Sequence, residues 1–330
     1  MRILQNTNYD FWGIRKIGFT VSGVLLALAV VALIYPGLQA GVDFQGGTEM
    51  VVQLQQPVDL GEARQTLATT LGEETEVKIY GSDRELLVRT PSADEIQVAR
   101  DRTVAALAAA FPGSAPTIGD SYSISPRFAG DLYRSAFYSV IGGLLVILLY
   151  VLARYDWRYG LGAVLTLGHD VVVVLGVFAF LNAVTPISFT ITQTIIAALL
   201  TIVGYSVNDT VVVYDRIRET QNLYRQDSFP TLANRAINAT LSRTVITGVS
   251  TLLALVVLLL FGGEELRGFA LALLIGIVLG TYSSIFVSTP IVVMLRERYP
   301  VRTRAVTAAR PSAARAGRAE AAPFRAPPSA

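Results

Sequence analysis

Six long apolar stretches, separated by shorter polar connections, dominate the hydropathy pattern of the chain. They lie at residues 17–35, 133–152, 161–181, 188–213, 244–262 and 268–294. About 20 mostly apolar residues are enough for a helix to cross the hydrocarbon core of a bilayer. The pattern therefore predicts a polytopic α-helical membrane protein with six transmembrane helices in one bundle.

The first stretch has two interpretations. Arg15 and Lys16 precede it, and Leu38-Gln39-Ala40 loosely resembles a signal-peptidase site. Its apolar run from residue 17 to 34 exceeds the 7 to 15 residues of a usual signal-peptide core. We expect a retained anchor, with a removed signal peptide as the alternative.

The longest polar segment, residues 36–132, predicts a small exported α+β domain. Alternating apolar and polar positions indicate strands at 48–55, 76–80, 85–90 and 117–125, and helical periodicity indicates helices at 58–71 and 92–111. Asp59 is the expected N-cap of the first of these helices. The order βαββαβ is the ferredoxin-like arrangement. With neither a metal-ligand cluster nor a nucleophile beside a base, the domain is expected to bind or transmit force, or merely to cap the membrane part.

Two further polar segments are expected on the opposite side of the membrane. Residues 214–243 form a basic, amphipathic connection in which Ser228 caps a helix starting near Pro230, and Leu232, Ala236, Ile237 and Leu241 share one face. We expect that helix to lie on the membrane surface. Residues 295–330 are rich in Ala, Pro and Arg and are expected to be a disordered basic tail. Its arginines are either solvated or in contact with anionic lipid or ribosomal RNA.

Composition and charge distribution support this topology. Hydrophobic residues make up 52% of the chain and charged residues 16%, against about 25% charged in soluble domains. The arginines of the short connections all fall on one side of a six-span chain, which predicts that the N-terminus (1–16) and the tail are cytoplasmic. Because the chain has no cysteine, disulfides and thiolate sites are excluded.

A few ionisable residues lie inside the apolar stretches, and these are the candidate functional residues. Asp209 is the one charge between residues 190 and 213. A carboxylate at such depth costs about 2.5 to 3.5 kcal/mol and is seldom present without a task. His169 and Asp170 lie in the third stretch, and Arg243 opens the fifth. Counting residues inward predicts that all four share one band in the cytoplasmic half of the bundle, with Asp209 and Arg243 as partners.

Such a pair can act as a proton-driven switch. A carboxylate in a low dielectric favours its protonated form, whereas an adjacent arginine favours the ionised form. If the helices move against each other, Asp209 alternates between the two states. A static ion pair that only specifies helix packing is the alternative, and for His169 with Asp170 a purely structural hydrogen bond competes with a relay role.

Small residues indicate where helices approach closely. The sequence has no internal repeat, which indicates that a second bundle would come from another chain. The small positions are Gly142 with Gly143, Gly160 with Gly162, Gly276 with Gly280, and Ser283 with Ser284. A single six-span bundle with polar residues and no second half implies a partner bundle in the membrane.

Five motifs give the chain a resemblance to a known family. They are GVDFQGGT at 41–48, GHD at 168–170, GYSVNDTVVVYDRIRE at 204–219, SRTVITG at 242–248 and GTYSSIFVSTP at 280–290. Together and in this order they resemble SecF, a membrane subunit of the bacterial Sec protein-export system. The match covers residue 41 to about 294 and leaves the tail outside it.

The resemblance implies a function and partners. SecF pairs with SecD in an arrangement similar to the RND exporters, and the pair uses the proton motive force to promote export of unfolded preproteins through the SecYEG channel, with YajC and YidC as further associated proteins. It implies a non-enzymatic protein of the bacterial inner membrane with no cofactor and no specific nucleic-acid partner. Asp209 would carry the proton and Arg243 would be its partner, while Asp170 and His169 are further relay candidates. The other family-motif positions are Asp43, Gly46, Gly47, Gly204, Asn208, Asp215 and Arg216.

Two other functions remain open on the residues alone. One is a structural or assembly subunit, which would need no proton exchange. The other is an RND-type exporter of small molecules, which would use the same proton exchange as SecF. The exporter normally has a duplicated bundle in one chain, which this chain lacks. An intramembrane hydrolase is excluded, because neither GxSxG nor HExxH is present.

Overall fold

The computed structural model describes residues 7–91 and 96–299 and contains, in this part, six helices long and apolar enough to cross a membrane. They are α1 (Arg15–Ala32) with η1 (Leu33–Gly37), α5 (Pro126–Arg154), α6 (Trp157–Val184), α7 (Gln193–Leu223), α8 (Phe229–Phe261), and α9 (Gly263–Ser283) continued by η2 (Ser284–Ser288) and α10 (Thr289–Arg298). The sixth span is thus one helical path interrupted by a π-helical segment.

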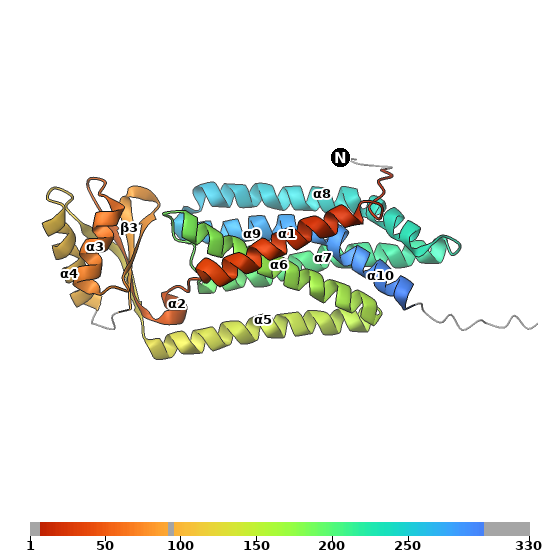
Figure 1. Ribbon diagram of the computed structural model, residues 1–330, viewed down its shortest axis with the longest axis horizontal. Helices are drawn as coiled ribbons and strands as arrows, with labels where there is room; N and C mark the ends of the chain where they lie inside the picture. The colour runs from red at the N-terminus through yellow and green to blue at the C-terminus, as the bar shows by residue number, and fades with distance from the viewer. Residues whose placement is uncertain (1–6, 92–95, 300–330) are drawn as a thin grey trace, which may run out of the picture.

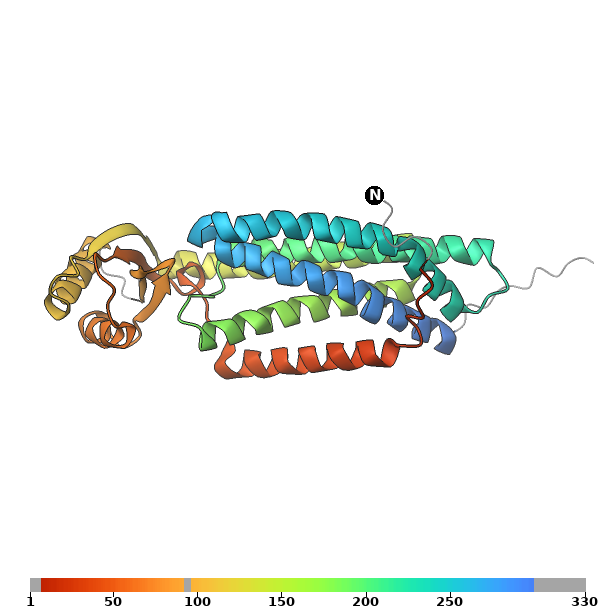
Figure 2. The same cartoon turned by 90° about the horizontal axis from the view of Figure 1, so that it is seen from above.

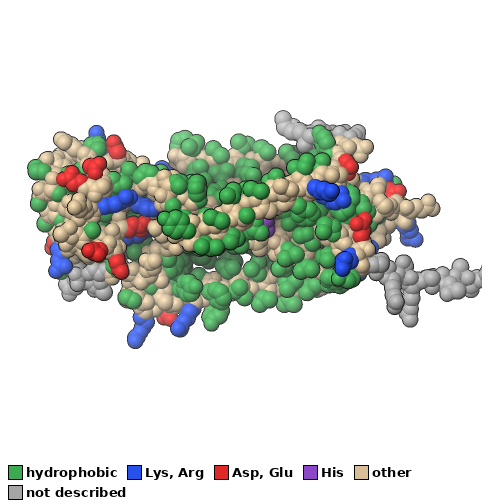
Figure 3. Space-filling view, viewed as in Figure 1, with side chains coloured by type: hydrophobic (Ala, Val, Ile, Leu, Met, Phe, Trp, Pro, Cys, Tyr) green, Lys and Arg blue, Asp and Glu red, His purple; other side chains and the backbone are tan. Residues whose placement is uncertain are grey.

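The helices run side by side in one elongated bundle, with a small α+β domain at one end (Figures 1 and 2). We call the end next to this domain the proximal end and the opposite end, where α5 turns into α6, the distal end. Apolar side chains cover the length of the bundle, and charged side chains gather at its two ends (Figure 3). This distribution is the one expected for a protein whose middle lies in hydrocarbon.

The α+β domain is a four-stranded antiparallel sheet with two helices on one face (Figure 1). Its elements are β1 (Gly47–Gln53), α3 (Leu60–Leu71), β2 (Glu76–Tyr80), β3 (Ser82–Thr90), α4 (Ile96–Ala110) and β4 (Thr117–Ile124). The strand order β2-β3-β1-β4, with β1 antiparallel to both of its neighbours, confirms the predicted ferredoxin-like βαββαβ fold.

The core of this domain lies between the sheet and its two helices. Alternate residues of the central strands, Met50 and Val52 in β1 and Val88 in β3, are fully buried against Leu67 of α3 and Leu107 of α4. Asp59 caps α3 by accepting a hydrogen bond from the Glu62 amide at 2.8 Å, as predicted. The domain therefore has its own hydrophobic core.

The structure differs from the sequence expectation in the connection before the fifth span. Ser228 caps a helix as predicted, but α8 then continues without a break to Phe261. Leu232, Ala236 and Ile237 are buried inside the distal end of the bundle. The prediction of a separate helix lying on the membrane surface is therefore wrong, because the apolar face of this segment packs against other helices of the same chain.

Helix ends also differ from the apolar stretches that indicated them. Helix α5 begins at Pro126, capped by Ser125, and α7 continues through its charged residues to Leu223. Polar side chains at these ends can extend into the headgroup layer, so hydropathy alone underestimates the helix length. The tail predicted to be disordered, residues 295–330, begins inside α10, which continues to Arg298, so the prediction is wrong for these first residues. Residues 300–330 lie outside the described part of the chain.

The segment before α1 is fastened to the distal part of α8. The Asn238 side chain accepts from the Tyr9 amide and donates to the Tyr9 carbonyl, both at 2.9 Å. Asn234 accepts from the Trp12 amide at 2.8 Å and donates to Asp10 at 2.6 Å. We call this arrangement the N-terminal clasp; it joins the first and fifth spans.

Candidate functional site

The ionisable residues inside the bundle lie at one level, near the middle of their helices. At 1.5 Å per residue, Asp209, Asp170 and Arg243 are each about 20 Å from the distal end of their own helix. These distances are greater than the apolar stretches indicated, because α6, α7 and α8 each extend past their apolar part at the distal end. The shared level itself agrees with the prediction of a single polar band.

Asp209 lies on α7 and is buried, with 3% of its surface exposed. Its Oδ2 atom has no hydrogen-bond partner among the described residues. The Thr281 hydroxyl of α9 and the charge of Arg243 are the groups that act on it. Asp209 is thus a mid-bundle carboxylate whose hydrogen-bonding capacity is not filled.

Arg243 lies on α8, the helix beside α7, but it is exposed on the surface of the bundle. In the part of the chain that the structure describes it forms no ion pair with Asp209. The expected direct pairing is therefore not present in this conformation. Arg243 acts on Asp209 through space, and its guanidinium can face a neighbouring molecule.

Asp170 on α6 has the opposite environment. Its Oδ2 accepts hydrogen bonds from Ser206 of α7 at 2.9 Å and from Ser283 of α9 at 2.8 Å, and its Oδ1 lies 3.0 Å from Nδ1 of His169. The carboxylate is almost fully buried and joins three helices. Sequence reasoning missed the two serines: Ser283 was noted only as a small residue, and no local pattern connects Ser206 to Asp170.

His169 is buried beside Asp170, and its Nε2 atom has no partner within the described residues. Because Nδ1 contacts a carboxylate, a neutral ring would carry its proton on Nδ1 and leave Nε2 as a free acceptor. The imidazole can therefore accept a proton without breaking an existing hydrogen bond.

Glycines on α9 allow the helices that hold these carboxylates to pack closely. A Cβ atom at Gly280 would lie 3.0 Å from the Ser206 side chain, and one at Gly276 would lie 2.4 Å from Ile202. The sequence prediction of close approach at these two positions is confirmed. It is wrong for Gly142 of α5, where a Cβ atom would meet nothing within 4 Å.

The first family motif connects the α+β domain to the proximal end of α7. It forms α2 (Val42–Gln45), where Asp43 accepts a hydrogen bond from the amide of Gln193, the first residue of α7, at 2.9 Å. Gly46 and Gly47 have φ angles of 78° and 112° and lead directly into β1. A Cβ atom at Gly47 would lie 2.4 Å from the Thr90 carbonyl oxygen, so this crossing requires glycine.

The remaining motif positions on α7 face outward. Gly204 and Asn208 are exposed, one turn apart, on the same helix that buries Asp209. Nearer the distal end, Asp215 pairs with Arg154 at 3.1 Å and Arg216 pairs with Glu219 at 2.7 Å. Gly204 and Asn208 therefore belong to the outer surface of the bundle and not to its interior.

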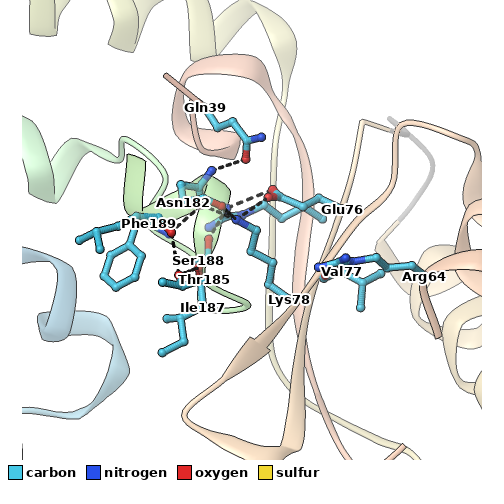
Figure 4. Close-up of polar contacts among 12 residues, drawn as sticks. Gln39, Arg64, Glu76, Val77, Lys78, Asn182, Thr185, Ile187, Ser188 and Phe189 are labelled. Atoms are coloured by element: carbon cyan, nitrogen blue, oxygen red, sulfur yellow. Dashed lines mark hydrogen bonds and ion pairs between the residues drawn. The ribbon is translucent and has the colours of Figure 1, made fainter. Parts of the chain in front are cut away.

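A polar junction fastens the α+β domain to the end of α6 and to the loop between α6 and α7 (Figure 4). Lys78 of β2 is buried and donates to both the backbone and the side-chain oxygen of Asn182, while Glu76 lies 3.5 Å from its amine. The Asn182 amide group donates to Gln39, and its Oδ1 accepts from the Phe189 amide at 3.0 Å. Burial lowers the pKa of the Lys78 amine, against the opposing effect of Glu76.

Backbone pairing and a second charged group reinforce this junction. The Ile79 amide donates to the Pro186 carbonyl at 3.0 Å, so the loop extends the outer edge of β2. Arg89 of β3 pairs with Glu49 and donates to Ser188 of the same loop at 2.9 Å. Tyr122 donates to Glu49 at 3.0 Å, and burial together with this carboxylate raises the pKa of its hydroxyl. Sequence reasoning missed the whole junction, because its members are scattered over the chain.

No group of three His, Cys, Asp or Glu side chains that could hold a metal is found in residues 7–91 and 96–299. The polar band contains two carboxylates, one imidazole and several hydroxyl groups. These groups can hold and exchange protons.

Comparison with known proteins identifies the family. Residues 104–298 match the family described as "Protein export membrane protein SecD/SecF, C-terminal", and residues 32–58 match the "SecD/SecF GG Motif". The chain belongs to the SecD/SecF family. The first match contains the polar band, and the second contains Asp43, Gly46 and Gly47.

Curated SecF proteins align with nearly the whole chain. The protein translocase subunit SecF of Rhodothermus marinus is 48% identical over 308 residues, which is 93% of this chain and 100% of that protein. The SecF of Pseudomonas aeruginosa is 37% identical over 286 residues, covering 87% of this chain and 91% of that protein.

Solved SecDF structures share the fold. The crystal structure of SecDF from Thermus thermophilus matches with a TM-score of 0.78 and 37% identity over 90% of this chain. A second structure, of SecDF in a super-membrane-facing form, matches with a TM-score of 0.65 at the same identity. This chain spans 40% of the length of each SecDF chain. It therefore corresponds to less than half of those proteins.

Proposed function

We propose that this chain is a SecF-type subunit that acts with SecD and uses the proton motive force to promote protein translocation through the SecYEG channel. The main evidence for this proposal is the environment of Asp209. Its carboxylate is buried in the middle of α7, and one of its oxygens has no hydrogen-bond partner among the described residues. An ionised carboxylate in that position is poorly compensated, whereas binding a proton removes the charge. Asp209 is therefore suited to take up and release a proton.

Arg243 would stabilise the second state of Asp209, in which the carboxylate is ionised. Its guanidinium remains charged at any physiological pH, so its approach to Asp209 would favour the ionised carboxylate. In the present conformation the two residues are on adjacent helices but are not paired. A movement of α8 against α7, or of a partner helix against both, would bring them together and release the proton.

Asp170 has a different task in this proposal. Its carboxylate is held by Ser206, Ser283 and His169, so it fixes α6, α7 and α9 relative to one another. Ser206 and Asp209 are one turn apart on α7. His169 can pass a proton along this band through its free Nε2 atom, which makes it a relay candidate.

The attachment of α7 to the α+β domain connects proton binding at Asp209 to movement of that domain. Asp43 caps the proximal end of α7, and the loop just before α7 is paired with both residue 40 and the edge of β2. A displacement of α7 would therefore be transmitted to the domain. Each charge crossing the membrane supplies about 2.3 kcal/mol per 100 mV, which is enough to bias two states of similar free energy.

The proposal includes location and partners. The distal end, where Arg154, Arg218 and Arg296 lie, is cytoplasmic by the positive-inside rule, and we expect both termini on that side of the membrane. The α+β domain faces the outside of a bacterial inner membrane. SecD is the partner that lies beside this bundle in the membrane. SecYEG, with YajC and YidC, is the further partner complex, and unfolded preproteins are the substrates. No enzymatic step and no cofactor is involved.

The test measures preprotein export into inverted membrane vesicles with and without a proton gradient. Asp209→Asn should abolish the stimulation by the gradient while leaving the gradient-independent export unchanged, and Arg243→Met should do the same. Glu219→Gln, on the exposed side of the same helix, is the matched control and should retain full stimulation. Unchanged gradient dependence in both Asp209→Asn and Arg243→Met would instead make this chain a structural assembly subunit.

A further inference from the structure

A cavity of about 240 Å³ opens at the distal end of the bundle, far from the polar band. Three arginines from three different elements line it: Arg154 at the end of α5, Arg218 on α7 and Arg296 on α10. Tyr155 and Tyr159 form its apolar wall. Three guanidinium groups around one space of this size are suited to a small anion.

The local structure holds these guanidinium groups in place but leaves donors available. Nη1 of Arg218 donates to the Arg154 carbonyl at 3.0 Å, and its guanidinium lies 5.5 Å from the centre of the Tyr155 ring. Nη1 of Arg296 donates to the Tyr159 hydroxyl at 3.2 Å, and its guanidinium lies 4.3 Å from the centre of the Phe229 ring. The other guanidinium nitrogens of Arg218 and Arg296 have no partner within the described part of the chain.

The cavity also carries positive charge that the protein does not neutralise. Arg154 is paired with Asp215 at 3.1 Å, and Asp156, the one acidic residue of the cavity wall, is paired with Arg158. Arg218 and Arg296 form no ion pair with any described residue. An anion that enters the cavity therefore meets two uncompensated charges.

We infer that this cavity binds the phosphate group of an anionic phospholipid. Trp157 and Tyr299 are exposed at the same end of the bundle with their ring centres 5.8 Å apart, as aromatic residues are at a membrane–water interface. On the helices that line the cavity, Leu149, Leu161 and Leu165 are exposed, so acyl chains can lie against them. Basic pockets between transmembrane helices on the cytoplasmic side are typical headgroup sites.

The experiment uses the full chain purified with its SecD partner in detergent and incubated with phosphatidylglycerol or phosphatidylcholine. Native mass spectrometry measures the lipid retained. The wild-type protein should retain phosphatidylglycerol in preference to phosphatidylcholine, and Arg218→Gln with Arg296→Gln should lower that retention at least about tenfold, since each charge-assisted bond to phosphate contributes about a factor of ten. Arg225→Gln with Arg298→Gln removes the same charge from the same end outside the cavity and should leave retention unchanged.

Two further arms distinguish a lipid site from a site for any soluble phosphate and from a loss of folding. Arg218→Lys with Arg296→Lys retains the charge, and partial retention in this variant would show that the glutamine variant failed through lost charge and not through misfolding. Equal retention in the glutamine variant and the wild type would overturn the inference. Soluble glycerol phosphate that displaces phosphatidylglycerol at equal concentration would also overturn it, because the acyl chains would then contribute nothing.

Discussion

The two carboxylates of the polar band occupy opposite environments although they lie on neighbouring helices at one depth. Asp170 has three side-chain partners on three elements, whereas Asp209 has an oxygen without any among the described residues. In a low dielectric, a carboxylate whose oxygens all accept hydrogen bonds is stabilised in its ionised form. A carboxylate that lacks such donors is stabilised more by binding a proton, which removes its charge. This contrast assigns fixed packing to Asp170 and proton exchange to Asp209 in our proposal.

The first prediction concerns the serines that hold Asp170. Ser283→Ala removes one hydrogen bond to a buried charged group and should lower the free energy of unfolding by about 1.5 to 3 kcal/mol. Unfolding of the purified protein in mixed detergent, followed by circular dichroism, measures the change. Ser250→Ala is the control, because its hydroxyl bonds only to the Thr247 carbonyl of its own helix. A similar effect in both variants would mean that Asp170 does not depend on Ser283.

Individual residues of the polar band differ in how far the sequence could predict them. Asp209, Asp170 and Arg243 were found because a charge inside an apolar stretch is visible in the sequence, and their common depth follows from counting residues. The partners of Asp170 were not found, because Ser206 and Ser283 come from helices whose rotation about their axes no periodicity specifies. The absent Asp209–Arg243 ion pair has the same cause: residue counting gives depth but not the direction in which a side chain points.

At the scale of elements, contacts between small residues determine which helices meet. A Cβ atom at Gly176 of α6 would lie 2.4 Å from the backbone Cα atom of Ala29 on α1. This contact brings the first span against the centre of the bundle. Since the obstacle is backbone, the neighbouring helix must move to make room for any side chain.

The second prediction follows from that contact. Gly176→Ala should lower the free energy of unfolding by about 1 to 3 kcal/mol through overpacking, even though alanine favours the helix. Gly142→Ala is the matched control; its Cβ atom meets nothing, so the variant should be neutral or slightly more stable. The same unfolding assay compares the two variants. Equal stabilities would show that α1 can shift freely on α6.

The third prediction concerns the junction between the α+β domain and the α6–α7 loop. Lys16 and Lys78 are the only lysines of the chain, and Lys16 is exposed whereas Lys78 is buried. An amine-reactive ester should therefore label Lys16 and spare Lys78 in the folded protein. Asn182→Ala removes the side-chain partner of the Lys78 amine and should raise its labelling roughly tenfold, as peptide mass spectrometry measures.

Lys16 gives this experiment its internal reference, since its labelling should not change. Gln97→Ala, on the exposed face of α4, is the control substitution. If Asn182→Ala left Lys78 protected, the backbone pairing of Ile79 with Pro186 and the Arg89 contacts would be sufficient to hold the junction closed.

At the scale of the whole molecule, the bundle is complete on one side only. Helix α1 covers one face, while the opposite face, where α7 lies between α5 and α8, has no covering helix within the described residues (Figures 1 and 2). Helix α5 is almost wholly exposed, and α8 exposes Leu253 and Leu260. Gly204 and Asn208 on α7 and Arg243 on α8 are exposed as well. This chain spans 40% of the length of the solved SecDF chain. We expect a partner bundle to cover the face that has no covering helix among the described residues.

The fourth prediction tests that position. Because the chain has no cysteine, a single one can be introduced without competing thiols. Asn208→Cys on α7 should form cross-links to cysteines in the membrane helices of SecD, whereas Leu28→Cys, exposed on the far side of the bundle on α1, should not. Gel mobility of the oxidised complex measures the product. Cross-linking of Leu28→Cys alone would place SecD on the other face.

The N-terminal clasp, finally, can form only late in synthesis. Tyr9 leaves the ribosome early, but its hydrogen-bonding partner Asn238 follows 229 residues later. At roughly 5 to 20 residues per second, the start of the chain waits between about ten and fifty seconds for the helix that secures it. Throughout that interval the first span lacks its fastening at the distal end of the bundle. A chain released before the fifth span would therefore have an N-terminal segment without these hydrogen-bonding partners.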